Sequence, residues 1–95
     1  MDDAAIVRLT GEYDISRRDE LDSLLDRFGD AEPLVFDFEA VNGIDTAAMR
    51  SLVRFQRART EAGKTPIVLA HVSARVRDFL AVADLGETFE LRDDI

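Results

Sequence analysis

The chain has 95 residues, 46% of them hydrophobic and 34% charged, which suits one globular domain over residues 1–95. Twenty acidic against 12 basic residues give a formal net charge of −8, which argues against direct binding to nucleic acid or to an anionic membrane surface. With no cysteine and one histidine the chain offers neither a disulfide nor a typical zinc site, so we predict no metal and no cofactor. No apolar run approaches the ~20 residues that cross a bilayer, and the acidic start is unlike a signal peptide, so we expect a cytoplasmic protein without membrane insertion.

The first half of the chain predicts a strand, a helix and a second strand. Residues 5–9 form a short β-rich run, which Gly11 ends. Ser16 can cap a helix that stops near Gly29. The apolar positions of this helix recur at helical spacing: Leu21, Leu24, Leu25 and Phe28. Residues 34–38 are mostly apolar, as in a central strand covered on both faces.

The second half continues the alternation. A helix is predicted from Thr46 to about Ala62, with Asp45 as its N-cap and Gly63 after its end. Residues 66–70 predict a buried strand, Ser73 caps a third helix, and a last short strand is expected near residues 88–91. The third helix has one apolar side, made of Val76, Phe79, Leu80 and Ala83. Alternating strands and helices predict an α/β fold, in which helical crossovers join like-directed strands of one sheet.

The second predicted helix carries the most functional information. At ~100° per residue, one stripe faces the core, made of Ala48, Leu52, Phe55 and Ala62. Thr46 points the opposite way, with Arg50 and Arg57 within about 40° of it. Two apolar residues, Met49 and Val53, flank that side and are expected to be only partly buried. Arg59 falls on the core stripe, and we expect its side chain to extend outward to solvent.

Two interpretations of this pattern are open. The simpler one is a capped helix with a solvated basic face. The functional one is a docking surface whose hydroxyl, on Thr46, accepts a phosphoryl group. Phosphate would add about −1.5 to −2 charges at the positive end of the helix dipole and near Arg50, so the fold would tolerate it. An acidic or closely packed partner would be repelled.

At this point the sequence resembles a family. Residues 41–49, VNGIDTAAM, are similar to the segment V-x-x-[IM]-D-[ST]-[ST]-G-[LM] of STAS domains, which include bacterial anti-sigma factor antagonists. Four further motifs follow the family's order: GEYD at 11–14, LVFDF at 34–38, AGK at 62–64 with IVL at 67–69, and VSARVR at 72–77 with Leu80 and Leu85. The resemblance implies a single-domain STAS-like α/β fold, with a mixed β-sheet of four to five strands and three to four helices.

The resemblance also implies a site and a mechanism. The hydroxyl directly after the aspartate is the family's phosphoacceptor, which is Thr46 here. Asp14 and Asp45 match positions of the family's partner surface. Together with the helix pattern this gives an expected contact surface of Asp14, Asp45, Thr46, Met49, Arg50 and Val53. Two positions depart from the motif, because Ala47 replaces a hydroxyl residue and Ala48 replaces glycine.

The implied function is partner switching, not catalysis. The unphosphorylated domain binds an anti-sigma factor with a kinase-type ATP-binding fold, and the sigma factor is released to act in transcription. The anti-sigma factor phosphorylates the domain and so releases it, and a phosphatase restores the unphosphorylated form.

Other classes of function remain as alternatives. STAS domains also serve as accessory subunits of membrane transporters, including lipid-transport systems, and some act in other signalling complexes without being phosphorylated. A hydrolase could be imagined from Ser73, His71 and an aspartate, but no nucleophile elbow is present. A receiver-like domain with Asp37 as phosphoacceptor would need more β/α units than the chain supplies, and Asp37 is more simply a polar strand position.

Overall fold

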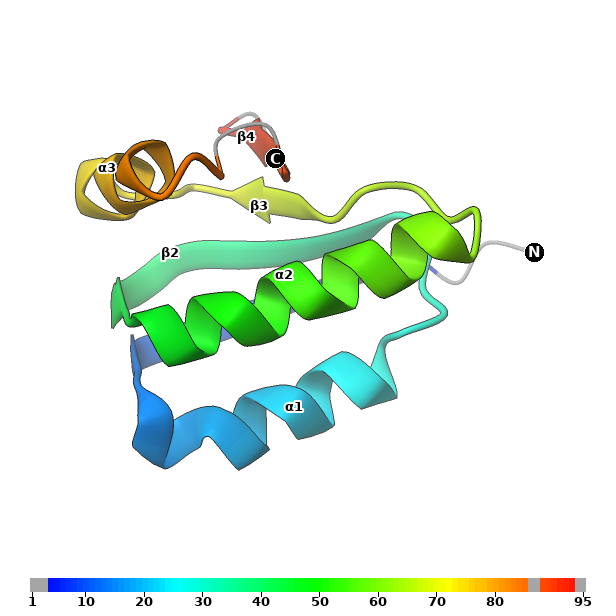
Figure 1. The fold of residues 1–95 in the computed structure, drawn as a ribbon, viewed down its shortest axis with the longest axis horizontal. Coiled ribbons are helices and arrows are strands. Elements are labelled where there is room, and N and C mark those ends of the chain that lie inside the picture. The colour runs from blue at the N-terminus through cyan, green and yellow to red at the C-terminus, as the bar shows by residue number, and fades with distance from the viewer. Residues whose placement is uncertain (1–3, 86–87, 94–95) are drawn as a thin grey trace.

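The computed structural model describes residues 4–85 and 88–93, so the acidic start at residues 1–3 lies outside the described part. Its elements in chain order are β1 (Ala5–Tyr13), the 3-10 turn η1 (Ile15–Arg17), α1 (Arg18–Arg27), β2 (Leu34–Ile44), α2 (Thr46–Glu61), β3 (Val68–Ala70), α3 (Ala74–Val82) and β4 (Glu90–Arg92). Figure 1 shows α1 and α2 side by side along one face of the sheet. The predicted alternation of strands and helices is confirmed.

The four described strands form one sheet in the order β1-β2-β3-β4, and every neighbouring pair is parallel. The α/β class and the numbers of strands and helices agree with the prediction, but the described sheet is parallel where a mixed one was expected. Parallel strands place their carboxyl ends at one edge of the sheet. The residues after β1, β2 and β3, which include Asp14, Asp45 and His71, therefore share that edge.

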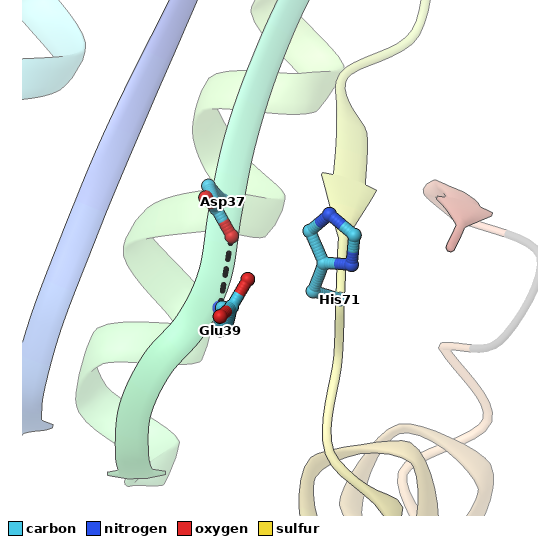
Figure 2. A group of neighbouring side chains, drawn as sticks. All are labelled: Asp37, Glu39 and His71. Atoms are coloured by element: carbon cyan, nitrogen blue, oxygen red, sulfur yellow. Dashed lines mark hydrogen bonds between the residues drawn. The ribbon is translucent and has the colours of Figure 1, made fainter. Parts of the chain in front are cut away.

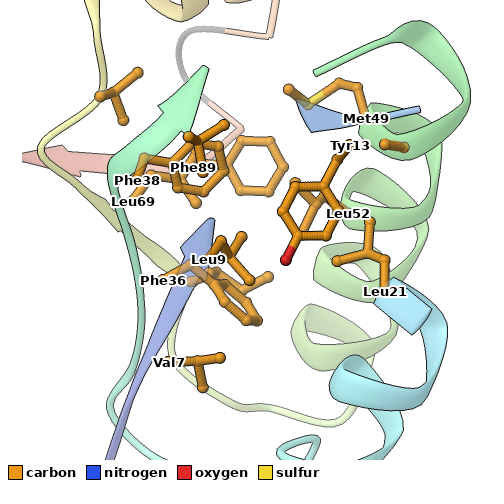
Figure 3. Close-up of a cluster of buried hydrophobic side chains, with 14 of the residues drawn as sticks. Val7, Leu9, Tyr13, Leu21, Phe36, Phe38, Met49, Leu52, Leu69 and Phe89 are labelled. Atoms are coloured by element: carbon orange, nitrogen blue, oxygen red, sulfur yellow. The ribbon is translucent and has the colours of Figure 1, made fainter. Parts of the chain in front are cut away.

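The main core lies between the sheet and the two helices α1 and α2. Figure 3 shows its centre, in which strand residues Leu9, Phe36 and Phe38 meet Leu52 of α2. These four side chains are at most 1% exposed. A smaller apolar cluster of Val35, Val68 and Ala70 lies on the opposite face, because side chains alternate along each strand. No helix in the described residues is both long and apolar enough to cross a membrane.

Two strands extend beyond their predicted ends. Gly11 was expected to end β1, but it adopts φ +79° and the strand continues to Tyr13. β2 continues alongside it to Ile44. The pairing shifts between Arg8 and Thr10, where one residue of β1 faces two of β2, Phe38 and Glu39. This is a β-bulge, and an alternating pattern read from one strand cannot reveal it.

The predicted start of the first helix was wrong. Ser16 does not cap it. Asp14 caps the preceding turn η1 by accepting a hydrogen bond from the Ser16 amide at 2.9 Å, and the Ser16 hydroxyl also donates to Asp14. The α-helix itself begins after Arg17, which makes no side-chain capping hydrogen bond.

The second helix matches its prediction in extent, and Asp45 is its N-cap. Two predicted positions near its end were wrong. Ala62 is exposed, because it is the C-cap residue at the end of the helix. Arg59 does not extend outward to solvent but is only 2% exposed. Its guanidinium donates to the backbone oxygens of Ala31 at 2.8 Å, Gly29 at 3.1 Å and Thr65 at 2.9 Å. Arg59 thus joins the end of α2 to the turns before β2 and β3.

One buried polar group of α2 has no partner, and this yields a stability prediction. The Ser51 side chain is 3% exposed, and its hydroxyl finds no hydrogen bond among the described residues. Replacing Ser51 with alanine removes a desolvated hydroxyl and improves helix propensity, so we expect Ser51→Ala to raise stability by about 1 kcal/mol. Thermal unfolding should show a melting temperature about 4–8 °C higher. A lower melting temperature would mean that Ser51 has a partner in solution.

Candidate functional site

Thr46 is the first residue of α2 and is exposed, as predicted. It lies beyond the carboxyl end of β2, where the strand turns directly into the helix at Asp45. The Asp45 carboxylate accepts a hydrogen bond from the Ala48 amide at 2.9 Å, which satisfies one of the free amides of the first turn. The Thr46 hydroxyl is not needed for capping. It therefore stands at the positive end of the helix dipole and is accessible to a partner.

A groove runs from Thr46 along the exposed side of α2 and is closed on its other side by α3. Its volume is about 430 Å³, and we call it the Thr46 groove. Its lining residues are Thr46, Arg50, Val53, Arg54, Arg57, Phe79, Ala83 and Leu85. At 1.5 Å per residue, the α2 side from Thr46 to Arg57 is about 16 Å long. Apolar side chains and arginines line the groove together, so it can bury apolar surface while binding negative charge.

Arg75 adds a further cation from α3. A shallower hollow beside the Thr46 groove is lined by residues of both helices: Thr46, Arg75, Asp78, Phe79, Val82 and Ala83. Val82 is 90% exposed there, the highest value among the large hydrophobic side chains that the structure describes. In a chain with a net charge of −8, the two hollows that share Thr46 are lined by four arginines, Arg50, Arg54, Arg57 and Arg75, and by one carboxylate, Asp78. This local excess of positive charge favours an acidic partner.

A second hollow, of about 240 Å³, lies at the carboxyl ends of β1 and β2. Asp14 and Asp45 line it, with Arg75 and Phe79 of α3 on the other side. The hydroxyl and then the amide of Ser16 hydrogen-bond to the Asp14 carboxylate and lower its pKa below the ordinary value, so this charge persists in mildly acidic solution. The hollow thus presents two carboxylates beside the basic groove.

Arg17 holds the neighbouring turn in place. Its guanidinium lies 3.9 Å from the centroid of the Tyr13 ring and donates to the backbone oxygens of Thr10 at 2.7 Å and Glu12 at 3.1 Å. It also forms an ion pair with Glu20. This arginine orders the end of β1 and with it the position of Asp14.

The structure brings most of the predicted contact residues together, with one exception. Thr46, Arg50 and Val53 line the Thr46 groove, and Asp14 and Asp45 line the adjoining hollow. Met49 was expected to be partly exposed, but it is 2% exposed and belongs to the main core with Tyr13 (Figure 3). At Met49 this side of α2 is enclosed in the core near the end of β1, so Met49 cannot contact a partner directly.

Sequence reasoning missed the contribution of α3. Phe79, Leu85 and Arg75 line the same surface as Thr46. Phe79 was predicted only as a core residue, and it is in fact half-buried. The spacing gave no signal for this role, since it does not show which part of the apolar side of α3 faces the groove. Ser73, the imagined nucleophile, accepts a hydrogen bond from the Val76 amide and caps α3, as predicted.

Comparison with known proteins assigns the family. A family model described as "Mlab, STAS domain" matches residues 1–93. The chain belongs to the STAS domain family. No curated protein matches the chain.

Three solved structures share the STAS fold. A sulfate transporter family protein from Wolinella succinogenes superposes with a TM-score of 0.79 at 24% identity, covering 97% of this chain and 78% of that one. A protein from Thermotoga maritima, proposed to be an anti-sigma factor antagonist, superposes with a TM-score of 0.82 at 17% identity, covering 100% of this chain and 83% of that one. The anti-sigma factor antagonist SpoIIAA in its unphosphorylated form superposes with a TM-score of 0.73 at 14% identity, again covering 100% of this chain and 83% of that one. The expected family and fold class are thereby confirmed, and the neighbours come from two functional settings.

Proposed function

We propose that this STAS domain is an anti-sigma factor antagonist, which binds an anti-sigma factor of kinase-type ATP-binding fold through the Thr46 groove and is released when Thr46 is phosphorylated. The observation that carries the proposal is the exposed Thr46 hydroxyl at the start of α2, at the end of a groove lined by arginines and apolar side chains. The contact surface consists of Asp14, Asp45, Thr46, Arg50 and Val53, extended by Phe79 of α3.

The chemistry is phosphoryl transfer on the partner's ATP. The Thr46 Oγ1 attacks the γ-phosphorus, a base of the partner takes the hydroxyl proton, and ADP leaves. The domain contributes only the acceptor, so it acts as a substrate and a binding module and not as an enzyme. A phosphatase then hydrolyses the phosphothreonine and restores the binding form. In this proposal the cycle takes place in the cytoplasm and regulates transcription.

The charges around Thr46 explain why phosphate would affect binding more than folding. Phosphothreonine carries about −1.5 to −2 charges at neutral pH. Within the domain, the amides at the start of α2 and the guanidinium of Arg50 or Arg75 favour that charge. A partner that meets the same arginines with its own carboxylates would face a neutralised surface and a bulky, strongly hydrated group. Binding would lose both charge attraction and close packing.

A second candidate is an accessory subunit of a membrane transporter of lipid-transport type. The description of the matching family model and the sulfate transporter family neighbour favour it. In that case the Thr46 groove would bind a membrane-associated ATPase. The same groove serves both candidates, so the identity of the partner decides between them.

Affinity capture from the native host with the tagged full chain tests the proposal. We expect a soluble protein with a kinase-type ATP-binding fold to be retained, and a transporter ATPase in its place would favour the second candidate. The purified partner and ATP should then place one phosphate on the chain, at Thr46, as located by mass spectrometry. Thr46→Val should abolish incorporation. Thr60→Val, at another exposed threonine of α2, is the matched control and should leave incorporation unchanged. Phosphate on another residue would contradict the proposal.

A further inference from the structure

A group of three potential metal ligands lies on the face of the sheet opposite α1 and α2. Asp37 and Glu39 belong to β2, and His71 is the first residue after β3. Their carboxylate and imidazole ligand atoms all lie within 4.8 Å of one another. In Figure 2 the three side chains stand on the near side of the sheet, while α2 passes behind it. This is the one such group among the described residues.

Strand alternation and one local departure from strand geometry bring these side chains together. Asp37 and Glu39 are two residues apart on β2, so alternation turns both to the same face, away from the buried Phe38 between them. His71 has φ +56°, a left-handed backbone that non-glycine residues adopt at a cost of about 1–2 kcal/mol. Along β3, Leu69 faces the core and Ala70 the opposite face, so a regular strand would turn His71 toward the core. The left-handed turn places His71 beside the two carboxylates instead.

One of the carboxylates is already oriented. Asp37 accepts a hydrogen bond from the Glu39 amide at 2.9 Å through one oxygen, which leaves the second oxygen as a potential ligand (Figure 2). Asp37 and His71 are half-buried and Glu39 is exposed. Ligand atoms around a zinc ion at ~2.0–2.2 Å lie roughly 3.3 Å apart, so closure from separations of up to 4.8 Å needs a movement of at most about 1.5 Å. The long, exposed Glu39 side chain can supply it by rotation.

We propose that Asp37, Glu39 and His71 form a binding site for a divalent transition-metal ion, with Zn²⁺ as the preferred ion. One imidazole and two carboxylates are a donor set that Zn²⁺ accepts, while Mg²⁺ prefers oxygen ligands and keeps its water. Three protein ligands on an accessible face leave the fourth tetrahedral position to water. The composition argued against a typical zinc site, because the chain has one histidine and no cysteine. The fold supplies the missing ligands from a neighbouring strand.

The competing explanation is that Asp37 serves only the bulge. Its carboxylate satisfies the Glu39 amide, and that role needs no metal. Two arginines also neighbour the group in the sheet, because Arg8 is paired with Asp37 and Arg92 with Ala70. They provide countercharge to the carboxylates and would weaken metal binding. The test therefore has to separate a metal site from a structural aspartate and from general attraction of cations to an acidic protein.

Isothermal titration of the full chain with zinc chloride, in a buffer that does not bind metal, makes this separation. We expect saturable binding of one Zn²⁺ per chain, and no comparable binding of Mg²⁺. His71→Asn removes the imidazole but keeps a residue that tolerates the left-handed backbone, and it should weaken Zn²⁺ binding by about 10–100-fold or more. Asp37→Asn keeps an acceptor for the Glu39 amide and should weaken binding without changing the melting temperature.

Asp84→Asn is the matched control. Asp84 is an exposed carboxylate that also has a positive φ, of 59°, and it lies outside the cluster. The Asp84→Asn variant should bind Zn²⁺ as the unmodified chain does. Should His71→Asn fold poorly, Glu39→Gln provides the same test at an exposed side chain. Several equivalent weak sites, equal binding of Mg²⁺, or unchanged affinity in His71→Asn or Glu39→Gln would overturn the proposal.

Discussion

Replacing Thr46 with glutamate is expected to weaken binding to the partner by about 100-fold, while the melting temperature stays within about 3 °C of the unmodified protein. The glutamate places a negative charge at the start of α2, where the helix dipole favours it, so the fold loses nothing. At the Thr46 groove the same charge competes for the arginines that would receive an acidic partner. Juxtaposed like charges at an interface cost several kcal/mol, which corresponds to about two to three orders of magnitude in affinity.

Two control variants make this result specific. Thr46→Val removes the hydroxyl but adds no charge, so it should retain binding and lose only phosphorylation. Ser23→Glu adds the same charge at an exposed position of α1, away from the Thr46 groove, and should bind as the unmodified chain does. Isothermal titration and thermal unfolding are measured on the same samples. Equal affinity for Thr46→Glu and the unmodified chain would refute the switch, and a large drop in its melting temperature would show that Thr46 is structural.

Replacing Arg59 with methionine is expected to lower stability by about 3 kcal/mol. The guanidinium donates to the backbone oxygens of Gly29, Ala31 and Thr65, and methionine leaves all three without that donor. Each buried acceptor that loses its partner costs about 1–3 kcal/mol. Water molecules that reach the freed oxygens and hydrogen-bond to them offset part of this sum. Burial lowers the pKa of Arg59, but the guanidinium stays charged at neutral pH, so charge-assisted hydrogen bonds are lost.

The measurement is again thermal unfolding, where a loss of this size lowers the melting temperature by about 12–24 °C. Arg57→Met is the matched control, because it makes the same substitution two residues earlier on the exposed side of α2. It should change stability by no more than about 0.5 kcal/mol. Similar melting temperatures for the two variants would mean that Arg59 does not join the turns as the structure indicates.

The arrangement of elements along the chain followed from local chemistry. Apolar spacing at 3.6 residues per turn placed α1 and α2, and the caps at Asp45 and Ser73 placed the starts of α2 and α3. These features depend on neighbouring residues alone, so one sequence contains them. The same helical pattern turned Thr46 and Arg50 outward, which is where the structure has them. Family motifs then added the identity of the fold, which periodicity does not provide.

Features that depend on two distant segments were not accessible in this way. Met49 is buried because it packs into the core near Tyr13 at the end of β1, and Arg59 is buried because two turns offer it backbone oxygens. Phe79 joins the Thr46 groove only because the fold places α3 across the groove from α2.

By itself, then, the sequence determined the order of strands and helices, the family, and an accessible hydroxyl at the start of α2. Tertiary structure decided which polar side chains are enclosed, which helix completes the groove, and that a lone histidine meets two carboxylates. The physical reason is that caps and periodicity act within about one turn of the chain, whereas burial and ligand geometry depend on residues that approach only when the sheet assembles.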